Sequence, residues 1–266
     1  MLQRLKALAR DALPRRWQVP VKYWYGRVRG DIEPEMALLR ALVDCGDHVV
    51  DVGGNRGTYA YRLWRIGARI EVFEPNPDCI GVLRGWAAGL DRVTVHGVAL
   101  SSQAGTAQLH VPVDEHGVAH DASASLEAGT PSDGRDIDVP LRTLDSFGFT
   151  DVSLIKIDVE GHESNVIEGA AVTLRAARPA LLIEIEQRHR REPIYTIFRD
   201  IEAFGYRGFF LLDGRLVGIE RFDVVRHQSL QAFESNSSRY HNNFLFLDAE
   251  RLKGGGYATL KVWWDG

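Results

Sequence analysis

The chain has 266 residues, of which 45% are apolar and 26% charged, and this size and composition suit one large α/β domain with a well-buried core. Lys and Arg total 32 against 36 Asp and Glu, a net charge of −4, so no overall basic surface recommends nucleic acid as a partner. The two cysteines indicate neither a disulfide framework nor a zinc site, and we find no secretory signal and no apolar run of the ~20 residues that cross a bilayer, which favours a cytoplasmic protein.

The N-terminal segment is basic. Residues 1–29 carry eight Lys or Arg and one acid, Asp11, against the acidic whole. Residues 1–34 are predicted to form a helical extension or lid, and Tyr23, Trp24 and Tyr25 are expected to cover the substrate pocket. Three interpretations compete: a packing helix or lid of the main domain, a surface that docks on an anionic membrane or substrate, and an oligomer contact.

Residues 48–59 combine a β-branched run with glycines, which predicts a buried strand, a tight turn and a helix. Gly53 and Gly57 would let the backbone approach a ligand where a Cβ would collide, and the helix N-terminus adds free N–H groups. The pattern Asp-x-Gly-x-Asn-x-Gly, which includes Asp51 and Asn55, lacks the Gly-x-Gly-x-x-Gly spacing of a dinucleotide loop. Asp51 favours a cationic or amine-bearing ligand over a phosphate.

A second strand, residues 69–74, ends in a carboxylate at the distance expected of a nucleoside-binding fold. Glu74 lies 21 positions after Gly53, where doubly wound folds place the group that binds a ribose diol. With Asp51, and with Asn76 in the following turn, the pattern predicts an S-adenosylmethionine site. The alternative is an acidic residue that ends an ordinary parallel strand.

Two later stretches are predicted to shape the ligand site. Ala99 and Leu100 cross the carboxyl edge of the sheet, where small residues let a flat adenine ring lie against the backbone. Residues 114–136 are polar and longer than an ordinary connection, which predicts a lid or an acceptor-binding loop. The alternative for this loop is a variable surface insertion.

The most informative acidic cluster follows a strand at residues 152–157, whose apolar character suits burial on both faces. Asp158 and Glu160, two apart along extended backbone, are expected to point to the same side, one toward the cofactor and one toward the acceptor. Burial and a neighbouring carboxylate would raise a carboxyl pKa toward the value that a general base needs. His162 is the competing base. The alternative is that these acids cap a helix at residues 163–177.

The next strand, residues 180–186, ends in two further carboxylates. Glu184 and Glu186 share one face, and Glu184 is expected to look across at Asp158 and to bind the acceptor, with His189 on the same rim. Glu184 and Asp158 would also suit a divalent cation such as magnesium, but we predict no metal site.

The chain resembles a known family, the FkbM family of S-adenosylmethionine-dependent methyltransferases. The resemblance runs from about residue 35 to about residue 246, with Gly54 and His162 standing where alanine is more usual. It is carried by residues 50–57, 72–77, 154–163 and 166–170. The alternation of strands and helices predicts a doubly wound α/β sheet of seven strands. The resemblance implies that this sheet is the Rossmann-like class I methyltransferase fold, with an antiparallel terminal hairpin, in one domain at residues 35–266.

The predicted function is O-methylation of a hydroxyl on a sugar, polysaccharide or secondary-metabolite acceptor, with S-adenosylmethionine as the cofactor. The partners expected are therefore a small-molecule or glycan acceptor and no nucleic acid, and the oligomeric state stays open. One alternative is N-methylation on the same fold. A nicotinamide-dependent oxidoreductase is disfavoured by the missing Gly-x-Gly-x-x-Gly, and a non-catalytic scaffold by the intact acidic cluster.

Overall fold

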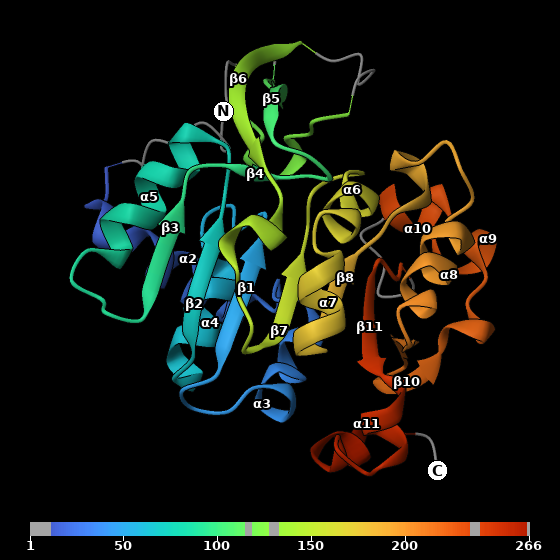
Figure 1. Cartoon of the computed structure of the whole chain (residues 1–266). Helices are drawn as coiled ribbons and strands as arrows, with labels where there is room; N and C mark the ends of the chain where they lie inside the picture. The colour runs from blue at the N-terminus through green and yellow to red at the C-terminus, as the bar shows by residue number, and fades with distance from the viewer. Residues whose placement is uncertain (1–11, 115–118, 128–132, 235–239, 265–266) are drawn as a thin grey trace.

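The computed structural model describes residues 12–114, 119–127, 133–234 and 240–264 (Figure 1). The strands are β1 (His48–Val52), β2 (Arg69–Phe73), β3 (Val93–His96), β4 (Ala99–Leu100), β5 (Gly105–Pro112), β6 (Gly134–Arg142), β7 (Val152–Ile157), β8 (Ala180–Glu184), β9 (Tyr206–Leu212), β10 (Arg215–Gly218) and β11 (Asn243–Asp248). The α-helices are α2 (Arg15–Arg29), α3 (Leu39–Leu42), α4 (Thr58–Ile66), α5 (Pro77–Ala87), α6 (Glu163–Glu168), α7 (Ala171–Ala177), α8 (Tyr195–Ala203), α9 (Val224–His227), α10 (Leu230–Glu234) and α11 (Ala249–Lys253). Short 3₁₀ turns include η1 (Pro34–Ala37), η2 (Asp121–Ser123), η3 (Leu144–Phe147), η4 (Gln187–His189), η5 (Ile219–Arg221) and η6 (Ala258–Trp263).

The main sheet has eight strands in the order β10-β9-β11-β8-β7-β1-β2-β3. The five strands from β8 to β3 in this order run parallel, whereas β11, β9 and β10 are joined by antiparallel pairing. The doubly wound α/β class and the antiparallel hairpin are thus confirmed. The expected count of seven strands is wrong by one, because β10, the return strand of the hairpin at Asp213 and Gly214, also joins the sheet.

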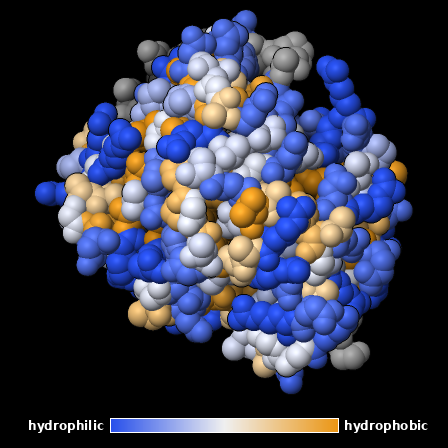
Figure 2. Space-filling model, viewed as in Figure 1, coloured by the Kyte–Doolittle hydropathy of each residue, from blue (hydrophilic) through white to orange (hydrophobic). Residues whose placement is uncertain are grey.

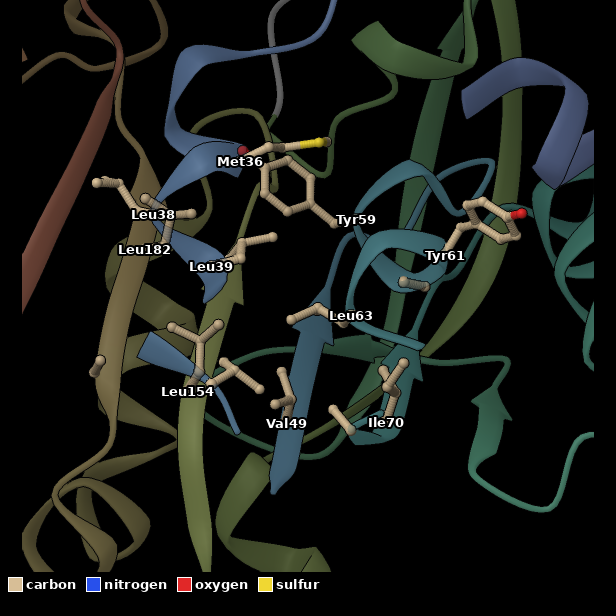
Figure 3. Close-up of a cluster of buried hydrophobic side chains, with 14 of the residues drawn as sticks. Met36, Leu38, Leu39, Val49, Tyr59, Tyr61, Leu63, Ile70, Leu154 and Leu182 are labelled. Atoms are coloured by element: carbon tan, nitrogen blue, oxygen red, sulfur yellow. The ribbon is translucent and has the colours of Figure 1, made fainter. Parts of the chain in front are cut away.

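Helices cover both faces of this sheet. One buried cluster joins α2, α4 and α5 to one face, and a second joins α6, α7 and α8 to the other. Figure 1 shows α6 and α7 in front of the sheet and α2 and α4 behind it. Figure 3 shows part of the first cluster, where Leu39 and Leu63 lie in the same layer as Val49 and Leu154 of the strands. In the view of Figure 2 hydrophilic residues cover most of the surface. No described helix is both long and apolar enough to span a membrane.

A separate three-stranded sheet, in the order β4-β6-β5, is inserted between β3 and β7. It stands above the carboxyl ends of β1, β2 and β7 in Figure 1. The stretch expected to be a polar loop at residues 114–136 is therefore shorter, because β6 begins at Gly134 and pairs with β5. Residues 115–118 and 128–132 of that stretch lie outside the described residues.

Two local expectations are wrong for identifiable reasons. The helix expected at residues 163–177 is divided into α6 and α7 at Gly169, where a Cβ would lie 2.0 Å from the carbonyl oxygen of Ser101. The aromatic residues of α2 do not cover a pocket: Tyr23 is 2% exposed and packs in the core, whereas Trp24 and Tyr25 face outward. The basic residues before position 12 lie outside the described part of the chain.

Candidate active site

The turn after β1 is shaped by close packing of two strand ends. Gly53 has φ +77°, and a Cβ there would lie 1.8 Å from the carbonyl oxygen of Asp158 at the end of β7. Gly57 has φ +76°, and a Cβ there would lie 2.9 Å from Leu83 Cδ2 and 3.0 Å from Val19 Cγ1. The backbone conformation and these neighbours are by themselves enough to require glycine at both positions.

Glu74 follows β2 and is held by the backbone on both sides of the site. Its Oε2 accepts the N–H of Asn55 at 2.6 Å, and its Oε1 accepts the N–H of Asn76 at 2.8 Å. The side chain is 6% exposed. Burial raises the pKa of Glu74 to about 7, although the two N–H bonds act in the opposite direction. The carboxylate is fixed at the junction of the β1 and β2 turns, with lone pairs left to accept from a ligand.

A cavity of about 280 Å³ lies at the carboxyl ends of β1, β2, β7 and β8. The insertion closes it from above with residues of β5 and of the 119–127 segment. Its lining residues are Glu33, Val52, Gly53, Asn55, Phe73, Glu74, Pro75, Ala99, Leu100, Leu109, Asp121, Ala124, Leu126, Asp158, Val159, Glu160 and Glu184. We call this the first cavity. Its described lining contains six carboxylates and no Lys or Arg.

The structure brings most of the predicted site residues to this cavity but not all of them. Gly53, Asn55, Glu74, Ala99, Asp158, Glu160 and Glu184 line it, whereas Asp51, Gly57, Asn76, His162 and His189 do not. Asn76 instead caps α5, accepting the N–H of Asp78 at 3.0 Å. Asp51 is 2% exposed behind the turn, and burial raises its pKa to about 6 against the opposing effect of Lys156.

His162 is held away from the cavity by its own hydrogen bonds. Its Nε2 lies 2.9 Å from Ser101 Oγ, and its Nδ1 lies 2.8 Å from Glu127 Oε1. The ring therefore joins the start of α6 to the inserted segment. Both ring nitrogens are used in this link, so the geometry gives the ring a structural role.

Glu160 does not follow the extended path expected of it. Its φ is +50°, so Asp158 and Glu160 are not related by the simple alternation of a strand. Both still reach the first cavity. His189 Nε2 lies 2.9 Å from Glu160 Oε2, close enough for an ion pair but poorly aligned for a hydrogen bond. His189 thus sits behind Glu160 and not on the cavity wall.

A buried lysine lies beneath the carboxylates. Lys156, on β7, is 1% exposed. Its Nζ lies 3.8 Å from Asp158 Oδ2, donates to Asn243 Oδ1 at 3.5 Å, and stands 4.9 Å from the centre of the Tyr59 ring. Burial lowers the pKa of Lys156, but the surrounding carboxylates outweigh it and raise the pKa above its usual value. The ammonium group is therefore charged at neutral pH.

Glu33, Asp158 and Glu184 form the carboxylate wall above this lysine. Tyr59 Oη and Asn243 Nδ2 both donate to Glu33 Oε2, the latter at 3.2 Å. Burial raises the pKa of Asp158 to about 7, with Lys156 opposing the rise, and burial together with Asp158 raises the pKa of Glu184 well above its usual value. This wall can accept a proton near neutral pH.

The inserted segment is fastened over the cavity by an ion pair. Arg56, in the turn after β1, donates from Nε to Asp121 Oδ2 at 2.8 Å, and Arg56 Nη2 also lies 2.8 Å from Asp121 Oδ2. Asn76 Nδ2 donates to the other oxygen of Asp121 at 3.2 Å. Both charged side chains are nearly buried, with 11% and 6% exposed. The described part of the predicted lid or acceptor-binding loop is thus attached through Asp121 to the turns after β1 and β2.

A second cavity, of about 710 Å³, adjoins the first through Glu33, which lines both. Asn242 Nδ2 donates to Glu184 Oε1 at 2.6 Å. This hydrogen bond joins the lining of the second cavity to that of the first. The lining of the second cavity includes carboxylates, amides and aromatic rings. The lining residues are Gly30, Asp31, Ile32, Glu33, Pro34, Glu35, Leu211, Asp213, Gly214, Phe233, Tyr240, His241, Asn242 and Asn243. No Lys or Arg is among these described residues. Burial raises the pKa of Glu35 to about 7.

Sequence reasoning missed Glu33, Lys156 and Asp121. Lys156 had a usable signal, because a single lysine inside a strand expected to be buried on both faces requires acidic partners. Asp121 lies in the stretch predicted to be a lid or an acceptor-binding loop, but nothing in the sequence distinguishes it from its neighbours. Glu33 had no signal, because it reaches the cavity from a segment far from the strand ends in sequence. Among the residues that the structure describes, no group of three or more His, Cys, Asp or Glu side chains is placed so that it could hold a metal ion.

Residues 44–209 match the methyltransferase FkbM domain, so the chain belongs to the FkbM methyltransferase family. The predicted family is confirmed. The 2-O-methyltransferase NoeI of Sinorhizobium fredii is 31% identical over 147 residues. That alignment covers 49% of this chain and 60% of NoeI, so the chain spans less than two thirds of this curated relative.

Solved structures with a similar arrangement include an FkbM methyltransferase from Methylobacillus flagellatus, with 18% identity and a TM-score of 0.49 over 88% of this chain and 55% of that one. Another is a SAM-dependent methyltransferase from Aquifex aeolicus, with 12% identity and a TM-score of 0.41 over 81% of this chain and 89% of that one. These likenesses are distant, and the fold assignment rests on the strand order and the family.

Proposed function

We propose that this chain transfers a methyl group from S-adenosylmethionine to a hydroxyl group of a sugar or a similar polyhydroxylated acceptor. The observation that carries the proposal is the first cavity, which has both Glu74 and Asp158 in its lining at the strand ends. Support for oxygen as the acceptor atom comes from NoeI, whose name is that of a 2-O-methyltransferase.

The lining of the first cavity suits this cofactor. Glu74 has the position and the free lone pairs to accept from a ribose diol, and Gly53 and Ala99 leave room for a flat ring. A wall of carboxylates without described Lys or Arg favours a cationic sulfonium and disfavours the pyrophosphate of a dinucleotide. The bound cofactor would supply an activated methyl group.

Asp158 is the residue best placed to remove the acceptor proton. It lies in the carboxylate wall beside Lys156, and its raised pKa makes it both ionised and basic near neutral pH. The hydroxyl proton would pass to the Asp158 carboxylate as the new carbon–oxygen bond forms. Glu160 lines the same cavity, with its carboxylate beside His189, and is the second candidate base.

The second cavity is the place we assign to the body of the acceptor. Glu33 lines both cavities, so an acceptor bound in the second cavity would lie next to the carboxylates of the first. Carboxylates and the amides of Asn242 and Asn243 can bind several hydroxyl groups. The absence of described Lys and Arg from its lining disfavours an anionic acceptor.

Methyl-labelled S-adenosylmethionine, incubated with the full-length protein and a panel of neutral saccharides and their amino analogues, tests this proposal. We expect a labelled O-methyl group, located on the product by NMR. Label on nitrogen alone would replace the O-methyl assignment with N-methylation, and no label on any of these acceptors would remove the support for a polyhydroxylated substrate.

Glu74→Gln is expected to weaken the binding of S-adenosylhomocysteine by about tenfold or more, because an amide cannot accept from two backbone N–H groups and a ribose diol at once. Titration calorimetry measures the change. Glu71→Gln is the matched control, since Glu71 lies on β2 just before Glu74 but binds His96 outside the cavity. Equal losses in the two variants would contradict the cofactor role of Glu74.

Lys156→Met is expected to move the pH dependence of methyl transfer to higher pH by about one pH unit or more, because the positive charge that favours ionised Asp158 is lost. In the unmodified protein the rate should rise through about pH 7, since the base must be deprotonated. The pH profile of kcat/KM checks both statements. Lys253→Met, at an exposed ion pair, is the control and should leave the profile in place.

A further inference from the structure

Helix α2 presents an apolar stripe to solvent. Trp17, Val21, Trp24 and Val28 follow one another at spacings of four, three and four residues, which places them on one face of a helix. Their exposed fractions are 53%, 44%, 44% and 84%. Large apolar residues aligned in this way differ from the scattered apolar residues of an ordinary surface.

The orientation of this stripe is fixed by the opposite face of the helix. Val19 and Tyr23 are 0% and 2% exposed and belong to the core cluster that α2 shares with α4 and α5. The helix therefore cannot turn its stripe inward without unpacking the core. The stripe is a fixed feature of the folded protein and does not belong to either cavity.

The charged residues of helix α2 are all basic. They are Arg15, Arg16, Lys22, Arg27 and Arg29; of these, Arg15 packs against Gly81 and Gly85 of α5 and not beside the stripe. The guanidinium groups of Arg27 and Arg65 lie 5.8 and 4.9 Å from the ring of Trp24. Asp31, just beyond the helix, pairs with Arg29 at 3.1 Å. This basic edge contrasts with the net charge of −4 of the whole chain.

We propose that α2 is a peripheral membrane-binding surface that places Trp17, Val21, Trp24 and Val28 in the interface of an anionic bilayer. Tryptophan is enriched at that depth, and a helix lying in the interface joins an apolar face to basic residues that attract anionic headgroups. The proposed partner is thus an anionic lipid surface, and the axis of α2 would lie parallel to that surface.

Charge complementarity and side-chain chemistry select this partner over two others. A symmetric dimer through the stripe would bring two α2 helices, whose charged residues are all basic, against one another. A nucleic acid would satisfy the cations, but Val21 and Val28 offer no ring on which a base can stack. A bilayer satisfies the cations and the aliphatic residues together.

Co-sedimentation of the full-length protein with vesicles tests this proposal. We expect binding to vesicles that contain phosphatidylglycerol and much weaker binding to pure phosphatidylcholine, with binding reduced by salt. Trp17→Ser combined with Trp24→Ser should weaken binding about tenfold or more. Val225→Ser combined with Val262→Ser is the matched control, because these residues are 80% and 73% exposed on other elements, and it should bind as the unmodified protein does.

Circular dichroism of each variant establishes that the fold is retained, as expected for substitutions of exposed side chains. Vesicle binding that survives the double tryptophan substitution would overturn the proposal, as would no binding to anionic vesicles. Light scattering that shows a dimer lost in the tryptophan variant, or binding to single-stranded RNA in place of vesicles, would overturn it in favour of those partners.

Discussion

Replacing Asp158 with asparagine is expected to lower the rate of methyl transfer by about 10²- to 10⁴-fold while changing the affinity for S-adenosylhomocysteine much less. The substitution keeps the shape of the side chain but removes the group that accepts the proton. Asp158 is the candidate because it stands in the carboxylate wall of the first cavity, 3.8 Å from Lys156 Nζ, with its pKa raised to about 7. Single-turnover rates and titration calorimetry on the same sample separate the two effects.

Two companion variants decide whether the assignment is specific. Glu160→Gln should also slow methyl transfer if this carboxylate shares the role, whereas His162→Ala should cost less than either, because its ring is occupied by Ser101 and Glu127 away from the cavity. Near-normal turnover in both amide variants, together with loss of activity in His162→Ala, would make histidine the base and the carboxylate assignment wrong.

Gly53→Ala is expected to lower the free energy of unfolding by at least about 3 kcal/mol, because its Cβ would have to displace backbone and not a flexible side chain. The new atom would lie 1.8 Å from the carbonyl oxygen of Asp158. Any folded fraction should also bind S-adenosylhomocysteine poorly, since β1 and β7 must separate at the cavity. Denaturant unfolding monitored by circular dichroism measures the loss.

Gly255→Ala is the matched control for this substitution. Gly255 has φ +79°, close to that of Gly53, but its Cβ would meet nothing within 4 Å. The expected cost is therefore only that of a left-handed backbone, about 1–2 kcal/mol. Similar losses in the two variants would show that backbone conformation, and not the contact between β1 and β7, explains the glycine at position 53.

The sequence was sufficient to predict that the turn after β1 and Glu74 lie together at one site. A buried strand, a glycine turn and a second strand ending in Glu74 are local features whose spacing reflects the doubly wound fold, and the structure brings Gly53 and Glu74 to the same cavity. The same spacing could not show that Gly57 and Asn76 serve packing and helix capping, because those roles depend on Leu83, Val19 and Asp78 across the turn.

The second cavity, where we propose that the acceptor binds, could not be predicted in the same way. Its walls come from the segment after α2, the β9–β10 turn and the start of β11, which only the tertiary fold brings together. Glu160 was placed on the assumption that side chains alternate along an extended chain. That assumption was wrong, because the φ of Glu160 is +50°, a backbone conformation that strands do not adopt. Partners of buried charges such as Lys156 are likewise a property of the packed structure.

Titration of the full-length protein with S-adenosylhomocysteine, by calorimetry, tests the central claim most directly. Our account predicts saturable binding at one site per chain, and no comparable heat on titration with NAD, since the described lining of the first cavity has six carboxylates and no Lys or Arg to meet a pyrophosphate. Saturable binding of NAD with no response to S-adenosylhomocysteine would contradict it.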